Sequence, residues 1–140
     1  MSKLKVLIPL DGTDTSLYSI QWIKKFFGPD VLEVTLINII DGLHTREKFS
    51  VGELEINLRR SMNILIQGES ELSGYTVNKA SALGTAPDAI LKEAEIGNYD
   101  MIIIAKSNIK GLIKFIGSVT TIIIRNSHIP VISVSEYNHY

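Results

Sequence analysis

The sequence contains no cysteine, and this absence excludes disulfide bonds, thiol catalysis and zinc sites built on cysteine. It also lacks an excess of positive charge, because 14 Lys and Arg residues stand against 15 Asp and Glu residues, for a net charge of -1. A general nucleic-acid binder needs surplus cations to displace the counterions of the phosphates. We therefore expect no nucleic-acid partner.

Long apolar runs are missing as well. The first apolar run ends at Leu10, too early for a signal peptide, and no later run approaches the ~20 residues that cross a membrane. We expect a cytoplasmic protein with no membrane partner. What the chain does have is a hydrophobic fraction of 45% over 140 residues, enough for the core of a single domain spanning residues 1–140.

Short apolar runs alternate with helical patterns along the chain. The runs are Val6–Leu10, Val31–Ile40, Tyr75–Leu83, Met101–Ala105 and Val131–Val134. Strands that are buried on both faces of a parallel sheet read as continuous apolar runs of this kind. The third run alternates more with polar residues, so we expect its strand nearer an edge of the sheet.

Three segments between these runs have the periodicity of amphipathic helices. The first repeats apolar residues from Leu17 to Phe27, with Thr13 as its expected N-cap. The third begins at Pro87, which suits a first helical turn, and ends at Gly97, which suits a C-terminal stop. The second carries the stripe Val51, Leu54, Leu58, Met62 and Leu65.

The segment Val119–Ile124 gives two conflicting signals. Its residues are β-branched, and local propensity favours a strand. The preceding Gly117-Ser118 is typical of a helix entry, and a parallel strand is reached only through a crossover of about a dozen residues. We follow the topological argument and predict a helix. The whole pattern then predicts an α/β fold, a doubly wound (Rossmann-like) five-stranded parallel sheet with helices on both faces.

One segment of this slightly acidic chain is purely basic. Between Asp100 and Glu136 there is no acidic residue, and the cations there are Lys106, Lys110, Lys114 and Arg125. The segment follows the fourth strand, at the edge where open parallel sheets bind ligands, and it leads into Gly117-Ser118. Helix N-termini bind phosphate through unpaired N–H groups, so one interpretation is a phosphate cradle. The other is a solvated basic loop with an ordinary helix start.

Two residues at strand ends have both a functional and a structural interpretation. Asp11 could accept a hydrogen bond from a ribose hydroxyl or help to hold a metal on a phosphate, but Asp-Gly is also an ordinary turn pair. Ile39 could offer an apolar wall and backbone groups to a base, but it is also an ordinary core residue.

At these positions the sequence resembles the universal stress protein family over nearly its whole length. The order and spacing of several segments carry the resemblance, rather than any single motif. In chain order, these segments are Lys5–Gly12 with a Pro-x-Asp turn, Leu36–Asp41, Gly84–Ile90 with one extra residue before its proline, Tyr99–Ala105, Gly117–Val119 and Pro130–Val134.

Nucleotide-binding members of that family carry Gly-x-x-Gly, nine residues, and then Gly-Ser or Gly-Thr. Here Ala105 and Asn108 stand at the two glycine positions, and eight residues separate Asn108 from the intact Gly117-Ser118. Asn tolerates left-handed backbone angles, so Asn108 is able to keep the turn. By resemblance, a triphosphate lies against these residues, and the base contacts the second strand and the Pro-x-Asp turn.

The resemblance thus implies a stress-response protein that binds ATP, with or without Mg²⁺. It also implies a homodimer paired through the last strand, Val131, Ile132, Ser133 and Val134, which we expect at an edge of the sheet. A nucleotide-free dimeric interaction protein with a degenerate phosphate loop is the alternative. The expected nucleotide-binding residues are Pro9, Leu10, Asp11, Ile39, Ala105, Ser107, Asn108, Gly117, Ser118 and Val119.

Three other functions fit the sequence less well. The chain has no Walker motif, no Gly-x-Ser-x-Gly elbow and no acid–base pair placed for chemistry, so we expect no catalytic residues, although slow ATP hydrolysis stays open. A phosphoacceptor receiver domain needs an Asp at the end of the third strand, where this chain reads Ser81–Gly84. A flavin-binding domain needs a first loop rich in Ser, Thr and Gly, whereas Asp11–Asp14 includes two acids.

Overall fold

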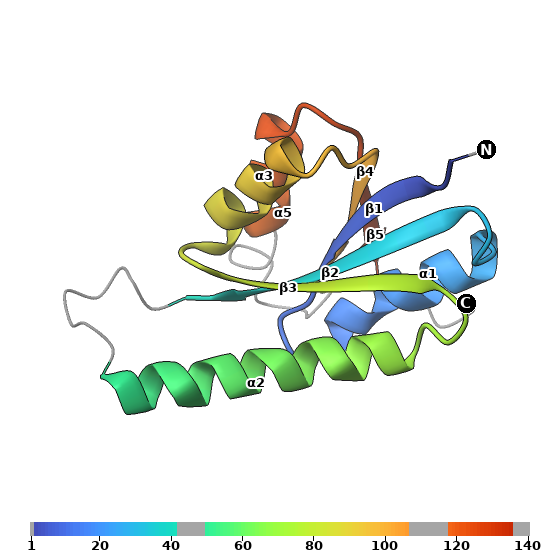
Figure 1. Cartoon of the computed structure of the whole chain (residues 1–140). Coiled ribbons are helices and arrows are strands. Elements are labelled where there is room, and N and C mark those ends of the chain that lie inside the picture. Colours follow the sequence, from blue (N-terminus) through green and yellow to red (C-terminus); the bar gives the residue numbers. More distant parts are fainter. Residues whose placement is uncertain (1, 42–49, 107–117, 136–140) are drawn as a thin grey trace.

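The computed structural model describes residues 2–41, 50–106 and 118–135, and its strands form one parallel sheet (Figure 1). The strands are Leu4–Pro9 (β1), Leu32–Ile40 (β2), Thr76–Leu83 (β3), Met101–Lys106 (β4) and Val131–Ser135 (β5). Their order across the sheet is β3-β2-β1-β4-β5, and every neighbouring pair is parallel. The predicted strands are confirmed, with ends shifted by a residue or two, and β3 lies at an edge as expected.

Helices connect these strands. They are the 3-10 turn Thr15–Leu17 (η1) and the α-helices Tyr18–Phe26 (α1), Val51–Ser70 (α2), Ala86–Ile96 (α3) and Ser118–Asn126 (α5). Helix α5 confirms the topological argument over local propensity, and its Ile123 is fully buried in the core. The expected N-cap was wrong, because α1 begins only at Tyr18. The Thr13 hydroxyl instead accepts a hydrogen bond from the N–H of Ser16, at 3.3 Å.

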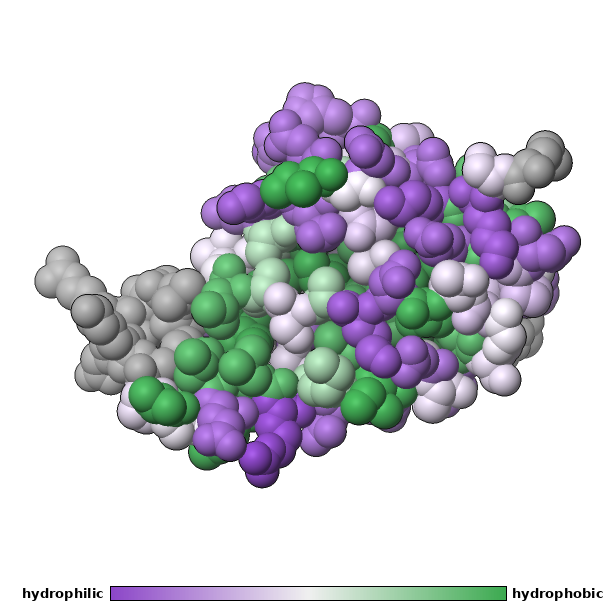
Figure 2. Space-filling model, viewed as in Figure 1, coloured by the Kyte–Doolittle hydropathy of each residue, from purple (hydrophilic) through white to green (hydrophobic). Residues whose placement is uncertain are grey.

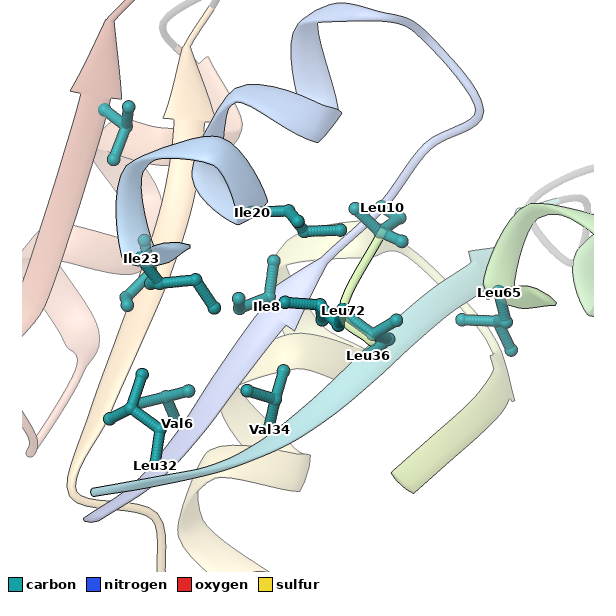
Figure 3. Close-up of a cluster of buried hydrophobic side chains, with 12 residues drawn as sticks. Val6, Ile8, Leu10, Ile20, Ile23, Leu32, Val34, Leu36, Leu65 and Leu72 are labelled. Atoms are coloured by element: carbon teal, nitrogen blue, oxygen red, sulfur yellow. The ribbon is translucent and has the colours of Figure 1, made fainter. Parts of the chain in front are cut away.

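The helices cover both faces of the sheet, with α1 and α2 on one face and α3 and α5 on the other (Figure 1). Alternate residues of a strand point to opposite faces, so β1 directs Val6 and Ile8 towards α1 and α2 and directs Leu7 towards α3 and α5. On the first face, Ile20 of α1 and Leu65 of α2 pack against the strands (Figure 3). Burial on both faces explains why the central strands read as continuous apolar runs.

Helix α2 buries only part of its apolar stripe, because Leu65 is fully buried and Leu54 is half-buried. Its buried residues are Ser61, Leu65 and Gly68, whereas Leu58 and Met62 are 45% and 44% exposed. Figure 2 shows the resulting apolar surface on the side of the molecule formed by β3 and α2. The periodicity therefore predicted the helix and part of the face that docks on the sheet.

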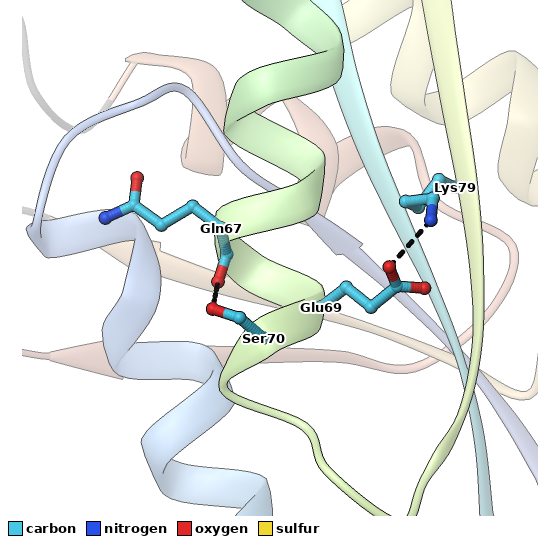
Figure 4. A network of polar contacts seen from close by, with 4 residues as sticks. All are labelled: Gln67, Glu69, Ser70 and Lys79. Atoms are coloured by element: carbon cyan, nitrogen blue, oxygen red, sulfur yellow. Dashed lines mark hydrogen bonds and ion pairs between the residues drawn. The ribbon is translucent and has the colours of Figure 1, made fainter.

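Both ends of α2 are fixed by polar contacts. At its N-terminus the hydroxyl of Ser50 accepts a hydrogen bond from the N–H of Glu53 at 3.1 Å. Near its C-terminus Glu69 forms an ion pair with Lys79 of β3, at 2.7 Å (Figure 4). In the described ranges, neither α2 nor any other helix is long and apolar enough to cross a membrane.

The central strand β1 pairs unequally with its two neighbours. It pairs with β2 along its whole length, Leu4–Pro9, but with β4 only through Val6 and Leu7. Beyond Leu7 the ladder between β1 and β4 ends, and this is also where the strand order reverses. The sheet therefore opens at the position where doubly wound folds bind their ligands.

Gly68 lies where α2 meets the sheet, and a Cβ atom there would come within 2.5 Å of Leu10 Cδ1 and 3.0 Å of Leu36 Cδ1. We expect Gly68→Val to lower the free energy of unfolding by about 1–3 kcal/mol through overpacking, as measured by urea denaturation. Gly52→Val in the same helix is the matched control, because nothing lies within 4 Å of its Cβ position. Equal stability of the two variants would contradict this packing.

Candidate functional site

The opening between β1 and β4 leads into a pocket of about 470 Å³, which we call the main pocket. This volume is typical of small-molecule sites. Strand ends supply Pro9, Ile39 and Ala105, and the first turns of α3 and α5 supply Ala86 and Val119. The main pocket thus lies at the carboxyl edge of the sheet, where the strand order predicts a ligand site.

Most of the site residues expected from the sequence meet at this pocket. It is lined together by Pro9, Leu10, Asp11, Ile39, Ala105 and Val119, which lie far apart in the chain. Ser118 is the first residue of α5, directly before Val119. The remaining expected residues, Ser107, Asn108 and Gly117, lie outside the described residues.

Ala105 stands where the resemblance places the first glycine of a phosphate loop. It lies within β4, and the one described non-glycine residue with a positive φ is Asn98, at 54°. A left-handed backbone is the conformation for which glycine is favoured over alanine. The replacement of glycine by Ala105 therefore imposes no backbone strain at this position.

The N-terminus of α5 faces the main pocket. Val119 and Thr120 of its first turn both line the pocket, so the unpaired N–H groups of this turn lie beside the cavity. Arg125 does not belong to this end, because it sits in the last turn, about 10 Å further along the helix axis. Lys106 is exposed at the end of β4, and Lys110 and Lys114 fall outside the described ranges.

Asp11 shapes the loop beside the pocket. Its Oδ1 accepts hydrogen bonds from the N–H of Thr13 at 2.9 Å and from the Thr13 hydroxyl at 2.5 Å. The next residue, Gly12, has a φ of +89°, and a Cβ atom there would lie 3.0 Å from Ile64 Cδ1 on α2. The turn interpretation of Asp-Gly is therefore right, and the same turn brings the Asp11 side chain to the pocket.

Asn38 is a site residue that the sequence reasoning missed. It is buried near the end of β2, and its amide Nδ2 donates a hydrogen bond to the carbonyl oxygen of Leu10 at 2.8 Å. This bond ties the end of β2 to the loop that follows β1. The signal was present in the sequence, because Asn38 is a polar residue inside the apolar run Leu36–Ile40, and buried polar residues are informative.

Hydroxyl groups line the pocket at two places. Thr13, Thr15 and Ser16 come from the loop and turn after β1, and Thr120 comes from α5. The Ser16 hydroxyl donates to the carbonyl oxygen of Thr13 at 2.8 Å, which fixes this side of the rim. Hydroxyls can both donate and accept hydrogen bonds, so the rim is suited to a sugar or a phosphate.

The walls of the pocket are apolar and carry little charge. Ile37, Ile39, Ile90 and Ile104 form these walls, and Asp11 is the one ionisable side chain among the lining residues that the structure describes. Within the described ranges, no group of three or more His, Cys, Asp or Glu side chains is placed to hold a metal ion. The arrangement can enclose a flat apolar group and present hydroxyl and N–H groups to a polar one.

Comparison with known proteins relates this chain to one family. A model of the universal stress protein family matches residues 4–135. Universal stress protein MJ0577 of Methanocaldococcus jannaschii is 29% identical over 157 aligned positions, which cover 96% of each chain. Its solved structure covers 99% of both chains with a TM-score of 0.71 and 28% identity.

Two further solved structures share the fold at lower identity. One is a universal stress protein in complex with cAMP, which is 15% identical, with a TM-score of 0.73 over 96% of this chain and 98% of that one. The other is a universal stress protein family protein from Arabidopsis thaliana with AMP bound. It is 13% identical, with a TM-score of 0.70 over 96% of this chain and 93% of that one.

The hydrogen bond of Asn38 makes a testable contribution to stability. We expect Asn38→Ala to lower the free energy of unfolding by about 1–3 kcal/mol, because the buried carbonyl of Leu10 loses its donor. Asn78→Ala is the matched control, since Asn78 is exposed on β3 and the change should stay within about 0.5 kcal/mol. Thermal or urea denaturation measures both. A loss no larger than that of the control would refute this role of Asn38.

Proposed function

Because this chain belongs to the universal stress protein family, we propose that it binds an adenine nucleotide, ATP foremost, and acts as a regulatory protein of the stress response. The observation that carries the proposal is the main pocket, which combines apolar walls with the N-terminus of α5. The end with apolar walls suits a base, and the end at α5 suits a phosphate.

The base belongs at the end of the pocket formed by β1 and β2. The apolar side chains of Ile39 and Ile90 enclose a volume of the right kind for a flat ring. Asp11 lies beside them and can accept a hydrogen bond from a ligand through the carboxylate oxygen that Thr13 does not occupy. This assignment agrees with the resemblance of Pro9–Asp11 to the Pro-x-Asp turn of the family.

The phosphates belong at the first turn of α5. Unpaired N–H groups and the positive end of the helix dipole favour an anion there, and the hydroxyl of Thr120 adds a donor. A Mg²⁺ ion would be held mainly by the phosphates, because Asp11 is the single carboxylate among the described lining residues. The ion would neutralise phosphate charge.

The ligands of related proteins support an adenine nucleotide. Universal stress proteins of the same fold have been solved with cAMP and with AMP, two ligands that share the adenine ring, the ribose and a phosphate. We propose that this chain acts by binding and releasing its nucleotide rather than by chemistry. The support is that Oδ1 of its pocket carboxylate, Asp11, is already engaged by Thr13 in a turn.

Thermal unfolding in the presence of nucleotide tests this proposal. We expect ATP with Mg²⁺, at about a hundred times its dissociation constant, to stabilise the folded chain by about 2.7 kcal/mol, because the ligand binds only the native state. AMP should stabilise it as well. No shift at millimolar nucleotide would reject the proposal and favour the second candidate, a nucleotide-free dimeric interaction protein.

Variants in the first turn of α5 test where the phosphates lie. Thr120→Asp puts a negative charge at the pocket and should weaken ATP binding by at least about tenfold through like-charge repulsion. Thr121→Asp is the matched control, because Thr121 is exposed on the same turn and does not line the pocket. Circular dichroism verifies that both variants fold. Equal affinities would move the phosphate site elsewhere.

We also propose a homodimer paired through β5. This strand is the edge of the described sheet next to β4, and an edge strand has unpaired backbone groups that tend to be covered. The hydrogen bond from Ile102 N–H to the carbonyl of Pro130 sets the register. In a parallel ladder the backbone groups alternate in direction, so those of Val131 and Ser133 point away from β4.

A proline at this edge tests the dimer. Ser133→Pro removes an outward N–H without removing a hydrogen bond to β4, so we expect a folded monomer. Ser133→Ala keeps the N–H and should remain a dimer at the same concentration. Sedimentation velocity distinguishes the two states, and a dimeric Ser133→Pro chain would exclude pairing through this strand.

A further inference from the structure

A second pocket of about 200 Å³ adjoins the main pocket on the α2 side of the sheet, and we call it the side pocket. The two pockets share three lining residues, Asp11, Asn38 and Ile39. The side pocket is therefore continuous with the end of the main pocket formed by β1 and β2. It is a separate space from the first turn of α5, none of whose residues line it.

The lining of the side pocket is polar and mixed in charge. Helix α2 contributes Asn57, Arg60 and Ser61, and Asp41 is contributed by the position directly after β2. The Ser61 hydroxyl lies 2.6 Å from the hydroxyl of Ser81 on β3, and this hydrogen bond holds the Ser61 side chain in place. These side chains present an amide, a guanidinium, a hydroxyl and a carboxylate. Together they match a small neutral group that both donates and accepts hydrogen bonds.

Two neighbouring arginines on α2 differ in their surroundings. Arg59 forms an ion pair with Glu55 at 3.2 Å, and it does not line the side pocket. Arg60 lines the side pocket and forms no ion pair with any residue that the structure describes. The guanidinium of Arg60 is thus able to donate to a group that enters from the main pocket.

The direction of a bound nucleotide follows from its chemistry and rests on the proposed function. In an adenine nucleotide the ribose and phosphate extend from N9, and the exocyclic amino group on C6 lies on the opposite side of the ring. With the phosphate at α5 and the base against Ile39, the amino group points away from α5, towards the end of the main pocket that joins the side pocket.

We propose that the side pocket receives a small polar substituent carried on the C6 amino group of the base, while the base itself stays in the main pocket. The ligand class is adenine nucleotides that carry a hydroxyl-bearing or similar neutral polar group on N6. Asn57, which is half-buried, and Arg60, which is exposed at the rim, then determine which substituents are accepted, because a lining of hydrogen-bonding groups favours a hydrogen-bonding group over an apolar group of equal size.

Titration calorimetry with three ligands tests this inference on the wild-type chain. The ligands are AMP, N6-hydroxyethyl-AMP and N6-propyl-AMP, of which the last two have nearly the same size and differ in polarity. We expect the hydroxyethyl analogue to bind within about threefold of AMP and the propyl analogue at least about fivefold more weakly. Both analogues binding more than about tenfold more weakly than AMP would overturn the inference and leave the proposed function intact. Absence of AMP binding would overturn both.

Matched variants on α2 identify the pocket. Asn57→Trp fills the side pocket and should weaken the hydroxyethyl analogue at least about tenfold while AMP stays within about twofold. Asn63→Trp, exposed on the same helix, should change neither affinity. Arg60→Ala should reduce the difference in affinity between the hydroxyethyl and propyl analogues, and Arg59→Ala should leave this difference unchanged. If Asn57→Trp weakens AMP binding as well, the comparison of Arg60→Ala with Arg59→Ala tests the inference instead. An unchanged preference in Arg60→Ala would overturn the inference.

Discussion

After Leu7, the central strand β1 stops pairing with β4 while it continues to pair with β2. The connection that leaves β1 leads to α1 on one face of the sheet, and α5, the next described helix after β4, packs on the other face. Neither helix fills the space between the diverging strand ends, so a hollow remains there and the first turn of α5 borders it. The position of the main pocket therefore follows from strand order and right-handed crossovers, before any single side chain is considered.

The strands and helices were predicted correctly where the local sequence pattern and the topology agreed. Strands buried on both faces had to be apolar throughout, and their runs marked them. For Val119–Ile124 local propensity and topology disagreed, and topology was right, because β5 can join a parallel sheet only after a crossover. The docked face of α2 was predictable only in part. This helix has apolar residues on more than one side, and the choice of Leu65 over Leu58 is made by tertiary packing. The site was predictable in part, because Pro9, Asp11 and Ala105 follow from strand ends. A polar residue inside an apolar run marked Asn38 as unusual, but its partner, the carbonyl of Leu10 in the loop after β1, is set by the tertiary fold.

The turn after β1 connects the two pockets and determines their shapes. The carboxylate of Asp11 stabilises this turn by accepting a hydrogen bond from Thr13, and Gly12 allows the turn to approach Ile64 of α2. The amide of Asn38 on β2 donates a hydrogen bond to the carbonyl of Leu10 in the same turn. These contacts use short side chains and a left-handed glycine, so few other residues could replace them without moving the loop. The turn thus separates a largely apolar pocket, lined by α3 and α5, from a polar one, lined by α2, while it leaves them joined at their common residues.

The main pocket is built mainly from features of the fold, whereas the side pocket is built from side chains particular to this chain. Under the proposed function, backbone N–H groups at the start of α5 and apolar walls would bind features that all adenine nucleotides share, namely a phosphate and a ring. Ala105 can stand at a glycine position without backbone strain because it lies within β4 and has no positive φ. Discrimination between related nucleotides needs side chains that differ in hydrogen bonding, and our inference assigns this role to Asn57 and Arg60 of α2. Because neither residue is required for the core packing of α2, they are free to differ between relatives that keep the same fold and the same phosphate site.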